Sequence, residues 1–272
     1  MNILLNWRKR VRITYRYKDN KSYWTKRWSD VPVDKPMENQ DVYPRKYSEL
    51  AIQKNDGRIL EAGCGNGRIL RYYHNLGYDI IGFDFIKVAI EKLKNTDSTL
   101  LVEVGDITKL RFENESFKYL LAFGLYHNLE HGLEDAVTET HRVLEKNGKV
   151  CASFRADNIQ TRLTDWLTNR RSKVRDNVGS RVFHKMNLTK NEFSVLFKNN
   201  GFEIENIYPV ENMPILYKFY FFRAKSHKKF NENIARSEGY KLSLLGQILQ
   251  NILMKCFPNQ FCNIYVLIAH KK

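Results

Sequence analysis

Short hydrophobic runs alternate with segments of helical periodicity from Arg58 to the end of the chain. Runs such as "YLLAF" are continuously apolar, as in strands that are buried on both faces of a parallel sheet. Alternation of such strands with helices is typical of βαβ units, so the pattern predicts an α/β fold with a parallel sheet. The predicted strands are residues 58–62, 78–84, 99–106, 117–124, 149–154, 203–211 and 262–272.

Segments with helical periodicity connect these strands. Their apolar residues recur every three or four positions, which places them on one face of a helix. Gly148 is predicted to end one helix, while Thr189 and Glu192 form a predicted capping box at the start of another. The predicted helices are residues 85–95, 133–148 and 189–202, together with a first helix that ends near Leu76.

The strand pattern divides the chain into a core and added segments. A basic and aromatic segment, residues 1–45, precedes the core at 46–211, and a helical insertion at 212–261 separates the core from the last strand at 262–272. A second long connection, 156–187, lies inside the core. Connections of this length in a compact domain are usually functional, so both are expected to contact a substrate.

The insertion contains an amphipathic run at 242–257, after the basic stretch "RAKSHKK" at 223–229. Such a run is more typical of a helix that packs against the core than of a helix that lies in a membrane surface, and both interpretations stay open. In the second case the basic stretch would contact phosphate head groups, and the protein would be peripheral at the inner face of the membrane.

Charge is unevenly distributed along the 272 residues. The net charge is +15, with 12 basic and 6 acidic residues in 1–50, 13 and 15 in 51–150, and 20 and 9 in 151–272. Basic flanks predict an anionic partner, and phosphorylated metabolites, nucleic acid and an acidic membrane surface all qualify. The alternative is that these lysines keep the surface solvated.

Two further features bear on the compartment. No apolar run approaches the roughly 18 residues that a membrane span needs, and the first residues do not resemble a signal peptide. The four cysteines form no CxxC pair, which favours reduced thiols over a disulfide framework. Both features predict a cytoplasmic protein.

The stretch "ILEAGCGNGR" carries the clearest chemical signal. Glu61 ends the first predicted strand, and three glycines follow at alternate positions: Gly63, Gly65 and Gly67. Glycines there let the backbone turn tightly and approach a ligand at the start of the next helix. Asp84 closes the second strand, where its carboxylate can accept hydrogen bonds from ribose hydroxyls, and Asp106 closes the third strand at the same edge of the sheet.

Two other site classes are weighed against this signal. A nicotinamide-binding domain is disfavoured because the spacing is G-x-G-x-G and not G-x-G-x-x-G. The stretch "HNLEH" contains His127, Glu130 and His131 in the H-x-x-E-H pattern of zinc proteases. Gly132 follows at once and the segment lies in a loop above the sheet, so no metal is predicted.

The run from the glycine turn through "GFD", "VGDITKLRF", "FGLYHNL" and "HRVLEKNGK" resembles the class I S-adenosylmethionine-dependent methyltransferases. The resemblance covers roughly residues 45–211 and 262–272. It implies a Rossmann-like, seven-stranded, mostly parallel sheet with helices on both faces and an antiparallel last strand. It also implies that the cofactor is S-adenosylmethionine.

Carried over residue by residue, the resemblance implies a cofactor site at the strand ends. The first acid and the glycine turn would hold the methionine part, Asp84 and Phe85 would lie at the ribose, and Asp106 and Ile107 beside the adenine. Phe123 opens the turn that would pass under the sulfonium and face the acceptor. The cofactor residues predicted in this way are Glu61, Gly63, Gly65, Gly67, Asp84, Phe85, Asp106, Ile107 and Phe123.

Acceptor residues are predicted around the same turn. His127 is the first candidate for a base that takes the proton of an attacking hydroxyl, and His131 is the second. A structural role for either histidine, in packing or capping, stays open. The predicted acceptor-binding residues are Tyr126 in the turn, Arg155 and Asn158 after the fifth strand, and Trp24 in a lid over the cofactor.

Missing motifs narrow the acceptor. No [DNS]PP[YF] follows the fourth strand and no Pro-Cys or Thr-Cys nucleophile lies at a strand end, which disfavours amino methylation of adenine and C5 methylation of cytosine. The preferred hypothesis is O-methylation of a small or lipid- or nucleotide-linked glycan. RNA methylation, with Tyr15 and Trp28 among the stacking residues, is the alternative, and a protein that binds the cofactor without catalysis is the third.

Overall fold

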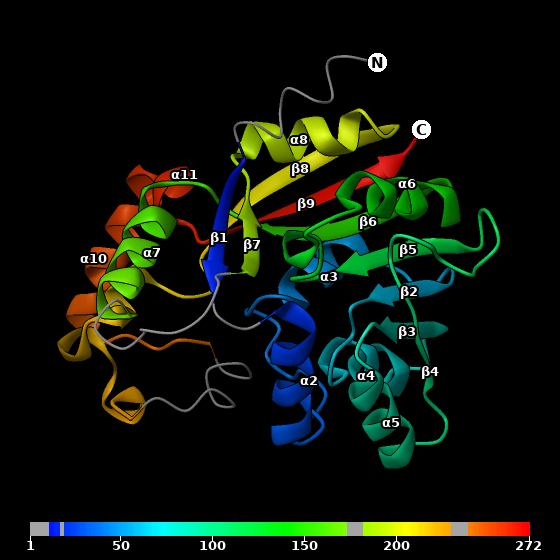
Figure 1. The fold of residues 1–272 in the computed structure, drawn as a ribbon, viewed down its shortest axis with the longest axis horizontal. Helices are drawn as coiled ribbons and strands as arrows, with labels where there is room; N and C mark the ends of the chain where they lie inside the picture. Colours follow the sequence, from blue (N-terminus) through cyan, green and yellow to red (C-terminus); the bar gives the residue numbers. More distant parts are fainter. Residues whose placement is uncertain (1–10, 17–18, 173–181, 230–238) are drawn as a thin grey trace.

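A seven-stranded sheet forms the centre of the computed structural model of the protein, which describes residues 11–16, 19–172, 182–229 and 239–272 (Figure 1). Its strands are β2 (Ile59–Ala62), β3 (Ile80–Asp84), β4 (Leu101–Val104), β5 (Phe117–Ala122), β6 (Leu144–Arg155), β8 (Phe202–Val210) and β9 (Ile264–Lys271). Their order across the sheet is β4-β3-β2-β5-β6-β9-β8. Strands β2 to β6 pair in parallel, and β9 runs antiparallel to both neighbours, which confirms the predicted fold.

Helices cover both faces of this sheet. They are α3 (Arg45–Ala51), α4 (Arg68–Asn75), α5 (Lys87–Thr96), α6 (Leu133–Val143) and α8 (Lys190–Lys198). Successive residues of a strand point to opposite faces, so Ile59 packs with α3, α4 and α5 while Leu60 packs with α6 and α8. The central strands are therefore buried on both sides, as their continuous apolar runs predicted.

The predicted end of the helix at Gly148 is wrong. Helix α6 ends at Val143, because the next residue, Leu144, already pairs with Phe117 in the sheet. Lys149 pairs with Tyr119, so the residues between Leu144 and Lys149 bulge out of β6. The capping box at Thr189 and Glu192 is confirmed at the start of α8.

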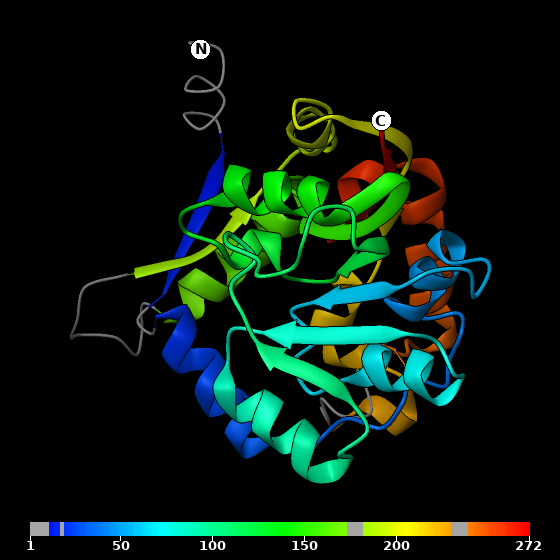
Figure 2. The same cartoon turned by 90° about the vertical axis from the view of Figure 1, so that its right-hand side faces the viewer.

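A two-stranded sheet that the sequence pattern did not predict joins the N-terminal segment to the first long connection. Strand β1 (Arg12–Arg16) pairs antiparallel with β7 (Val182–Asn187), which follows helix α7 (Ile159–Ser172). Helix α2 (Asn20–Asp30) is the next element along the chain and lies beside α5 in both views (Figures 1 and 2). The basic segment and the 156–187 connection thus meet on one side of the sheet.

The insertion forms short helical turns and two helices. These are η2 (Ile215–Lys218), η3 (Tyr220–Phe222), η4 (Lys225–His227), α10 (Leu244–Cys256) and α11 (Pro258–Phe261). The expectation that the amphipathic run packs against the core is wrong, because Leu244 and Leu245 of α10 are 76% and 59% exposed. The buried side of α10 carries Gly246 and Gln250 instead. Its apolar face therefore lies on the surface.

No helix in the described part of the chain is long and apolar enough to cross a membrane. The four cysteines are free thiols, of which only Cys256 is exposed.

Candidate functional site

Three glycines shape the turn between β2 and α4. Gly63, Gly65 and Gly67 all have left-handed backbone angles, with φ of 72°, 53° and 81°. Side chains are strained in this region of φ. A Cβ at Gly65 would also lie 2.7 Å from the ring of Trp28. The turn therefore needs glycine at these positions.

Asp84 ties this turn to the neighbouring strand. One carboxylate oxygen accepts a hydrogen bond from the amide of Gly65 at 2.9 Å, and the other accepts one from the amide of Ile86 at 2.8 Å. Burial raises the pKa of Asp84, against the effect of these amides, which lower it. Each oxygen keeps a further lone pair, so the carboxylate can still accept hydrogen bonds from a ligand.

A cavity of about 700 Å³ opens over the ends of β3 and β4. Phe85 is half exposed on its wall, whereas Ile107 is buried beneath it. Asp106 also lines this cavity, and its Oδ1 accepts hydrogen bonds from the backbone and hydroxyl of Thr108 at 2.9 and 2.8 Å. An aromatic ring, an apolar floor and two carboxylates suit a nucleoside.

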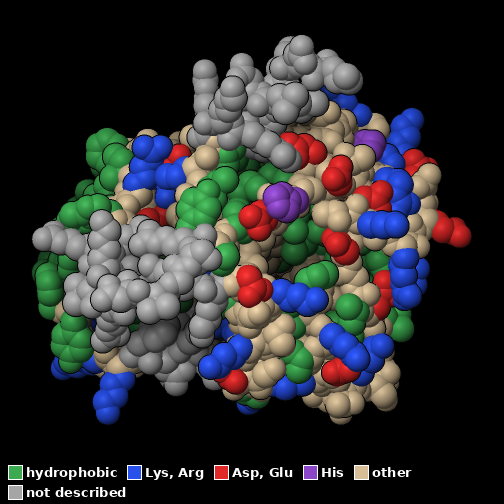
Figure 3. Space-filling view, in the orientation of Figure 1, with side chains coloured by type: hydrophobic (Ala, Val, Ile, Leu, Met, Phe, Trp, Pro, Cys, Tyr) green, Lys and Arg blue, Asp and Glu red, His purple; other side chains and the backbone are tan. Residues whose placement is uncertain are grey.

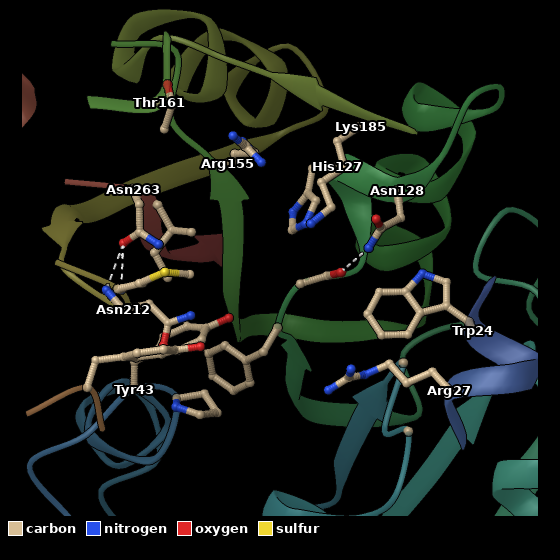
Figure 4. Close-up of a pocket in the computed structure, with 18 of the residues that line it drawn as sticks. Trp24, Arg27, Tyr43, His127, Asn128, Arg155, Thr161, Lys185, Asn212 and Asn263 are labelled. Carbon is tan, nitrogen blue, oxygen red and sulfur yellow. Dashed lines mark hydrogen bonds between the residues drawn. The ribbon is translucent and has the colours of Figure 1, made fainter. Parts of the chain in front are cut away.

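A second cavity, of about 480 Å³, lies over the ends of β2, β5 and β6 (Figure 4). It borders on the first, because both are lined by Trp24, Trp28, Gly63, Phe123, Gly124 and Asn128. The two cavities therefore meet where β5 ends. We refer to them below as the 700 Å³ cavity and the 480 Å³ cavity.

Glu61 lines the 480 Å³ cavity and is 5% exposed. Its Oε2 has no hydrogen-bond partner in the described part of the structure. Burial raises the pKa of Glu61 to about 8, although the charge of Arg68 opposes this. A buried carboxylate with an unpaired oxygen is stabilised by a cationic ligand group.

Hydrogen bonds fix the turn at the junction of the two cavities. The amide of Gly124 donates to Oγ of Ser153 at 2.8 Å, and the hydroxyls of Ser153 and Tyr43 lie 2.9 Å apart. The ring of Phe123 packs edge-on against Tyr43, with centroids 5.6 Å apart. Phe123 is thus held in place between the cavities.

His127 follows in the 3-10 turn η1 (Tyr126–Asn128) and points into the 480 Å³ cavity (Figure 4). It is 7% exposed, and its Nδ1 has no partner in the described part of the chain. Burial, together with the charges of Lys185 and Arg155, holds the pKa of His127 well below its usual range. The imidazole is therefore neutral at neutral pH.

Residues 60–152 match a family profile described as a methyltransferase domain. An uncharacterized methyltransferase of Schizosaccharomyces pombe is 29% identical over 84 residues, which make up 29% of this chain and 58% of that protein. The chain thus spans less than two thirds of that relative.

Solved structures share the fold over most of the chain. An S-adenosylmethionine-dependent methyltransferase of Methanosarcina mazei is 17% identical, covers 85% of this chain and 98% of its own, and gives a TM-score of 0.57. A methyltransferase of Haloferax volcanii in complex with the Trm112 methyltransferase activator is 12% identical, covers 94% and 99%, and gives 0.59. Residues 60–152 thus carry a methyltransferase domain, in a fold that is shared with S-adenosylmethionine-dependent methyltransferases of known structure.

The site of this methyltransferase domain fits its cofactor. The orphaned carboxylate oxygen of Glu61 matches the ammonium of the methionine part, and a Cβ on Gly63 or Gly65 would narrow the cradle beside it. Asp84 lies where ribose hydroxyls can donate to it, and Phe85 and Ile107 offer apolar contact to adenine. All predicted cofactor residues except Gly67 line one of the two cavities; Gly67 caps the start of α4.

Two predicted acceptor residues point away from the methyltransferase site. Tyr126 is fully buried and its hydroxyl lies 2.6 Å from that of Thr140, so its prediction as a substrate contact is wrong. The prediction of Asn158 as an acceptor-binding residue is wrong for a similar reason. Its amide nitrogen donates to the carbonyl oxygen of Cys262 at 2.7 Å, while its Oδ1 caps α7 through the amide of Thr161.

The other predicted residues are divided between the cavities. Trp24 lines both and stacks on Trp28 with centroids 5.5 Å apart. Arg155 lines the 480 Å³ cavity, and its guanidinium forms an ion pair with Asp165. His131 lies on the wall of the 700 Å³ cavity, apart from His127.

The H-x-x-E-H stretch of the methyltransferase domain is not one helix. It starts in the η1 turn and ends in irregular backbone before Gly132, which has φ of 71°. His127 and His131 therefore do not share a helix face. Among the described residues, no group of three or more His, Cys, Asp or Glu side chains is arranged to hold a metal ion.

Sequence reasoning missed Lys185 and Tyr43, which also line the 480 Å³ cavity. Lys185 lies on β7, whose polar and apolar residues do not alternate clearly enough to predict a strand. Tyr43 lies in a loop before α3. The only signal in the sequence for these two residues was the expectation that the segments containing them approach the substrate.

Proposed function

We propose that the protein methylates a hydroxyl group of an anionic, glycan-type acceptor, either a small molecule or a glycan linked to a lipid or nucleotide. The observation that carries this proposal is the charge of the 480 Å³ cavity. Glu61 is the single acidic residue among the described residues of its wall, which also contains five cationic ones: Arg27, Arg68, Arg155, Lys185 and Lys218. A cavity lined in this way favours an anionic acceptor.

Bound S-adenosylmethionine supplies an electrophilic methyl group on its sulfonium. We assign Glu61 and the glycine turn to the methionine part, Asp84 and Phe85 to the ribose, and Asp106 and Ile107 to the adenine. Phe123 lies between the cavities, so the methyl group would face the 480 Å³ cavity there. The aromatic side chains of Trp24 and Trp28 would exclude water from above.

His127 is our candidate for the base. An alcohol is a poor nucleophile at neutral pH, and a neutral imidazole within reach can remove its proton as the new oxygen–carbon bond forms. The carbon–sulfur bond of the bound cofactor would break in the same step, and the proton would end on the imidazole of His127. His127 suits this role because it is neutral and faces the acceptor cavity. His131, on the other cavity, is the weaker candidate.

A membrane surface is the proposed source of a lipid-linked acceptor. Hydrophobic side chains line the edge of the molecule where α7, α10 and α11 lie (Figures 1 and 3). Phe222 joins the η3 turn to α10, since its carbonyl accepts a hydrogen bond from the amide of Ser243 at 2.7 Å. The exposed apolar residues of this face are Leu244, Leu245, Ile248, Leu249 and Ile252 of α10, with Phe219, Tyr220 and Phe221.

Basic residues Arg223, Lys225 and Lys228 adjoin this apolar face in sequence. Apolar burial combined with basic residues is how peripheral proteins bind anionic lipids. We therefore place the protein in the cytoplasm, at the inner face of the membrane. Flotation with phosphatidylglycerol vesicles should show binding that is lost in the double variant Leu245→Glu, Ile252→Glu. Equal flotation of variant and wild type would contradict this placement.

A turnover assay separates the candidate functions. Formation of S-adenosylhomocysteine would be followed with lipid-linked glycans, sugar nucleotides and RNA as separate acceptor fractions. Turnover with a glycan fraction supports the proposal, whereas turnover with RNA alone supports the alternative of an RNA methyltransferase. Cofactor binding without turnover in any fraction supports a non-catalytic binding protein.

A further inference from the structure

A cationic cluster lies on the acceptor side of the 480 Å³ cavity. Lys185 comes from β7, Arg155 from the end of β6, and His127 from η1, and the three side chains converge in Figure 4. Strand β7 packs against both β6 and η1, which brings the three elements together. Arg27 lies on the opposite side of the cavity, below Trp24. The cluster is therefore separate from the glycine turn.

The cluster is short of negative charge. No described residue forms a hydrogen bond or ion pair with Nζ of Lys185, and Nε of Arg155 is buried without a partner. Arg155 does pair with Asp165, but Arg12 pairs with the other oxygen of the same carboxylate. Asp165 is thus shared between two guanidinium groups, of which Arg12 also pairs with Asp157, and Lys185 has no ion-pair partner among the described residues.

The pKa shifts of Lys185 and Arg155 agree with this shortage of negative charge. Burial, assisted by the charge of Arg155, lowers the pKa of Lys185 to about 7. Burial also lowers the pKa of Arg155. Both side chains would be stabilised as cations by an anion that lies between them.

We propose that Lys185 and Arg155 form a subsite for a phosphate group of the acceptor, beside His127. This inference rests on the proposed function and narrows its anionic acceptor to a phosphate ester or diphosphate. A carboxylate binds best to a guanidinium that can donate two parallel hydrogen bonds. Asp165 already accepts a hydrogen bond from Nη2 of Arg155, so this geometry is not available to a carboxylate ligand. A tetrahedral phosphate can be bound by an ammonium as a point charge and by the remaining Nε–H.

A phosphate in this position would also affect the base. The charges of Lys185 and Arg155 lower the pKa of His127, and an anion bound between them offsets those charges. His127 would therefore become a stronger base once the acceptor's phosphate is bound. The acceptor would in this way help to activate its own hydroxyl group.

Calorimetric titration with inorganic pyrophosphate, in the presence of S-adenosylhomocysteine, tests the subsite. Malonate serves as a dicarboxylate for comparison. We expect pyrophosphate to bind at least about tenfold more tightly than malonate, and Lys185→Met to weaken it by about tenfold or more. Lys185→Arg should retain most of the affinity. The matched control Lys54→Met, in an exposed loop before β2, should bind like wild type.

Binding of S-adenosylhomocysteine to each variant shows whether it is folded and whether the cofactor site is intact. Unchanged pyrophosphate affinity in Lys185→Met overturns the inference, as does equal affinity for malonate and pyrophosphate. If Lys185→Met does not fold, Lys185→Gln takes its place. Absence of methyl transfer with retained pyrophosphate binding would contradict the proposed function but not the subsite.

Competition identifies the source of the phosphate. UDP and farnesyl diphosphate carry the same diphosphate on a nucleoside and on a prenyl chain. Tighter binding of UDP indicates a nucleotide-linked acceptor, and tighter binding of farnesyl diphosphate indicates a lipid-linked one. Failure of both to displace pyrophosphate would overturn the assignment of the subsite to the acceptor.

Discussion

The two cavities of the site are built in different ways. The 700 Å³ cavity lies over the ends of β3 and β4, strands of the central parallel sheet, and Asp84 is hydrogen-bonded to the glycine turn beside it. The acceptor side of the 480 Å³ cavity is made by segments that are far apart in sequence, including α2 and β7. Residues of α2 and β7 line both cavities, but Arg27 of α2 and Lys185 of β7 line the 480 Å³ cavity alone.

The largest effect should come from the base on the acceptor side. His127→Ala should lower turnover by about 100- to 10,000-fold, because general base catalysis contributes a factor of that order. His131→Ala, on the 700 Å³ cavity, should stay within a few-fold of wild type. Steady-state formation of S-adenosylhomocysteine measures both variants. A His127→Ala rate within a few-fold of wild type would contradict the assignment of the base.

A substitution in the wall shared by the two cavities should lower the affinity for both ligands. Trp24→Ala removes a ring that lines both cavities, so it should weaken S-adenosylhomocysteine and pyrophosphate alike, each by about tenfold. Trp166→Ala is the control, since Trp166 lies on α7 outside both linings and is 54% exposed. Calorimetry measures the four affinities. A loss confined to one ligand would show that Trp24 belongs to one cavity only.

Cofactor binding should release a proton from Glu61. Burial raises the pKa of Glu61 to about 8, so the carboxyl group is mostly protonated at pH 7. An ammonium group beside it favours the ionised form, so most of one proton should leave. Calorimetric titration of S-adenosylhomocysteine in two buffers of different ionisation enthalpy measures this number. Glu61→Gln should abolish the difference between buffers, and its persistence would contradict the account.

The smallest effect concerns stability and pH. Burial and the charge of Lys185 lower the pKa of His184 to about 3, against about 6.5 in an unfolded chain. Below about pH 6.5 the unfolded chain binds a proton that the folded protein does not, so this histidine makes stability fall as the pH decreases. Urea unfolding at pH 7.5 and 5.5 should show a smaller loss in His184→Gln than in wild type. An identical loss would argue against a lowered pKa of His184 in the folded protein.

The same contrast explains what the sequence could predict. The strands of the large sheet, the glycine turn and Asp84 were predictable, because continuous apolar runs mark buried strands and acidic residues mark their ends. Lys185 was not, because β7 becomes a strand only by pairing with β1, and Thr14 and Lys185 are far apart in the sequence. Pairing at that distance leaves no local pattern.

The direction of side chains in short turns could also not be predicted from the order of apolar and polar residues. Tyr126 and His127 are neighbours in η1, yet one packs in the core and the other faces the cavity. In α10 the spacing of the leucines predicted one apolar face correctly but not whether it is buried. Gly246 and Gln250 determine which side of α10 is buried. The small Gly246 lets the helix approach Phe222, and the amide of Gln250 donates a hydrogen bond to Glu211.

The central claim is that the two cavities bind their ligands independently. Titration of two ligands into two variants tests it most directly. Asp84→Ala should weaken S-adenosylhomocysteine by about 100-fold, through lost hydrogen bonds to ribose, and leave pyrophosphate binding unchanged. Lys185→Met should weaken pyrophosphate by about tenfold and leave S-adenosylhomocysteine unchanged. If either variant weakens both ligands to the same extent, the two cavities are not independent halves of one site and the account is contradicted.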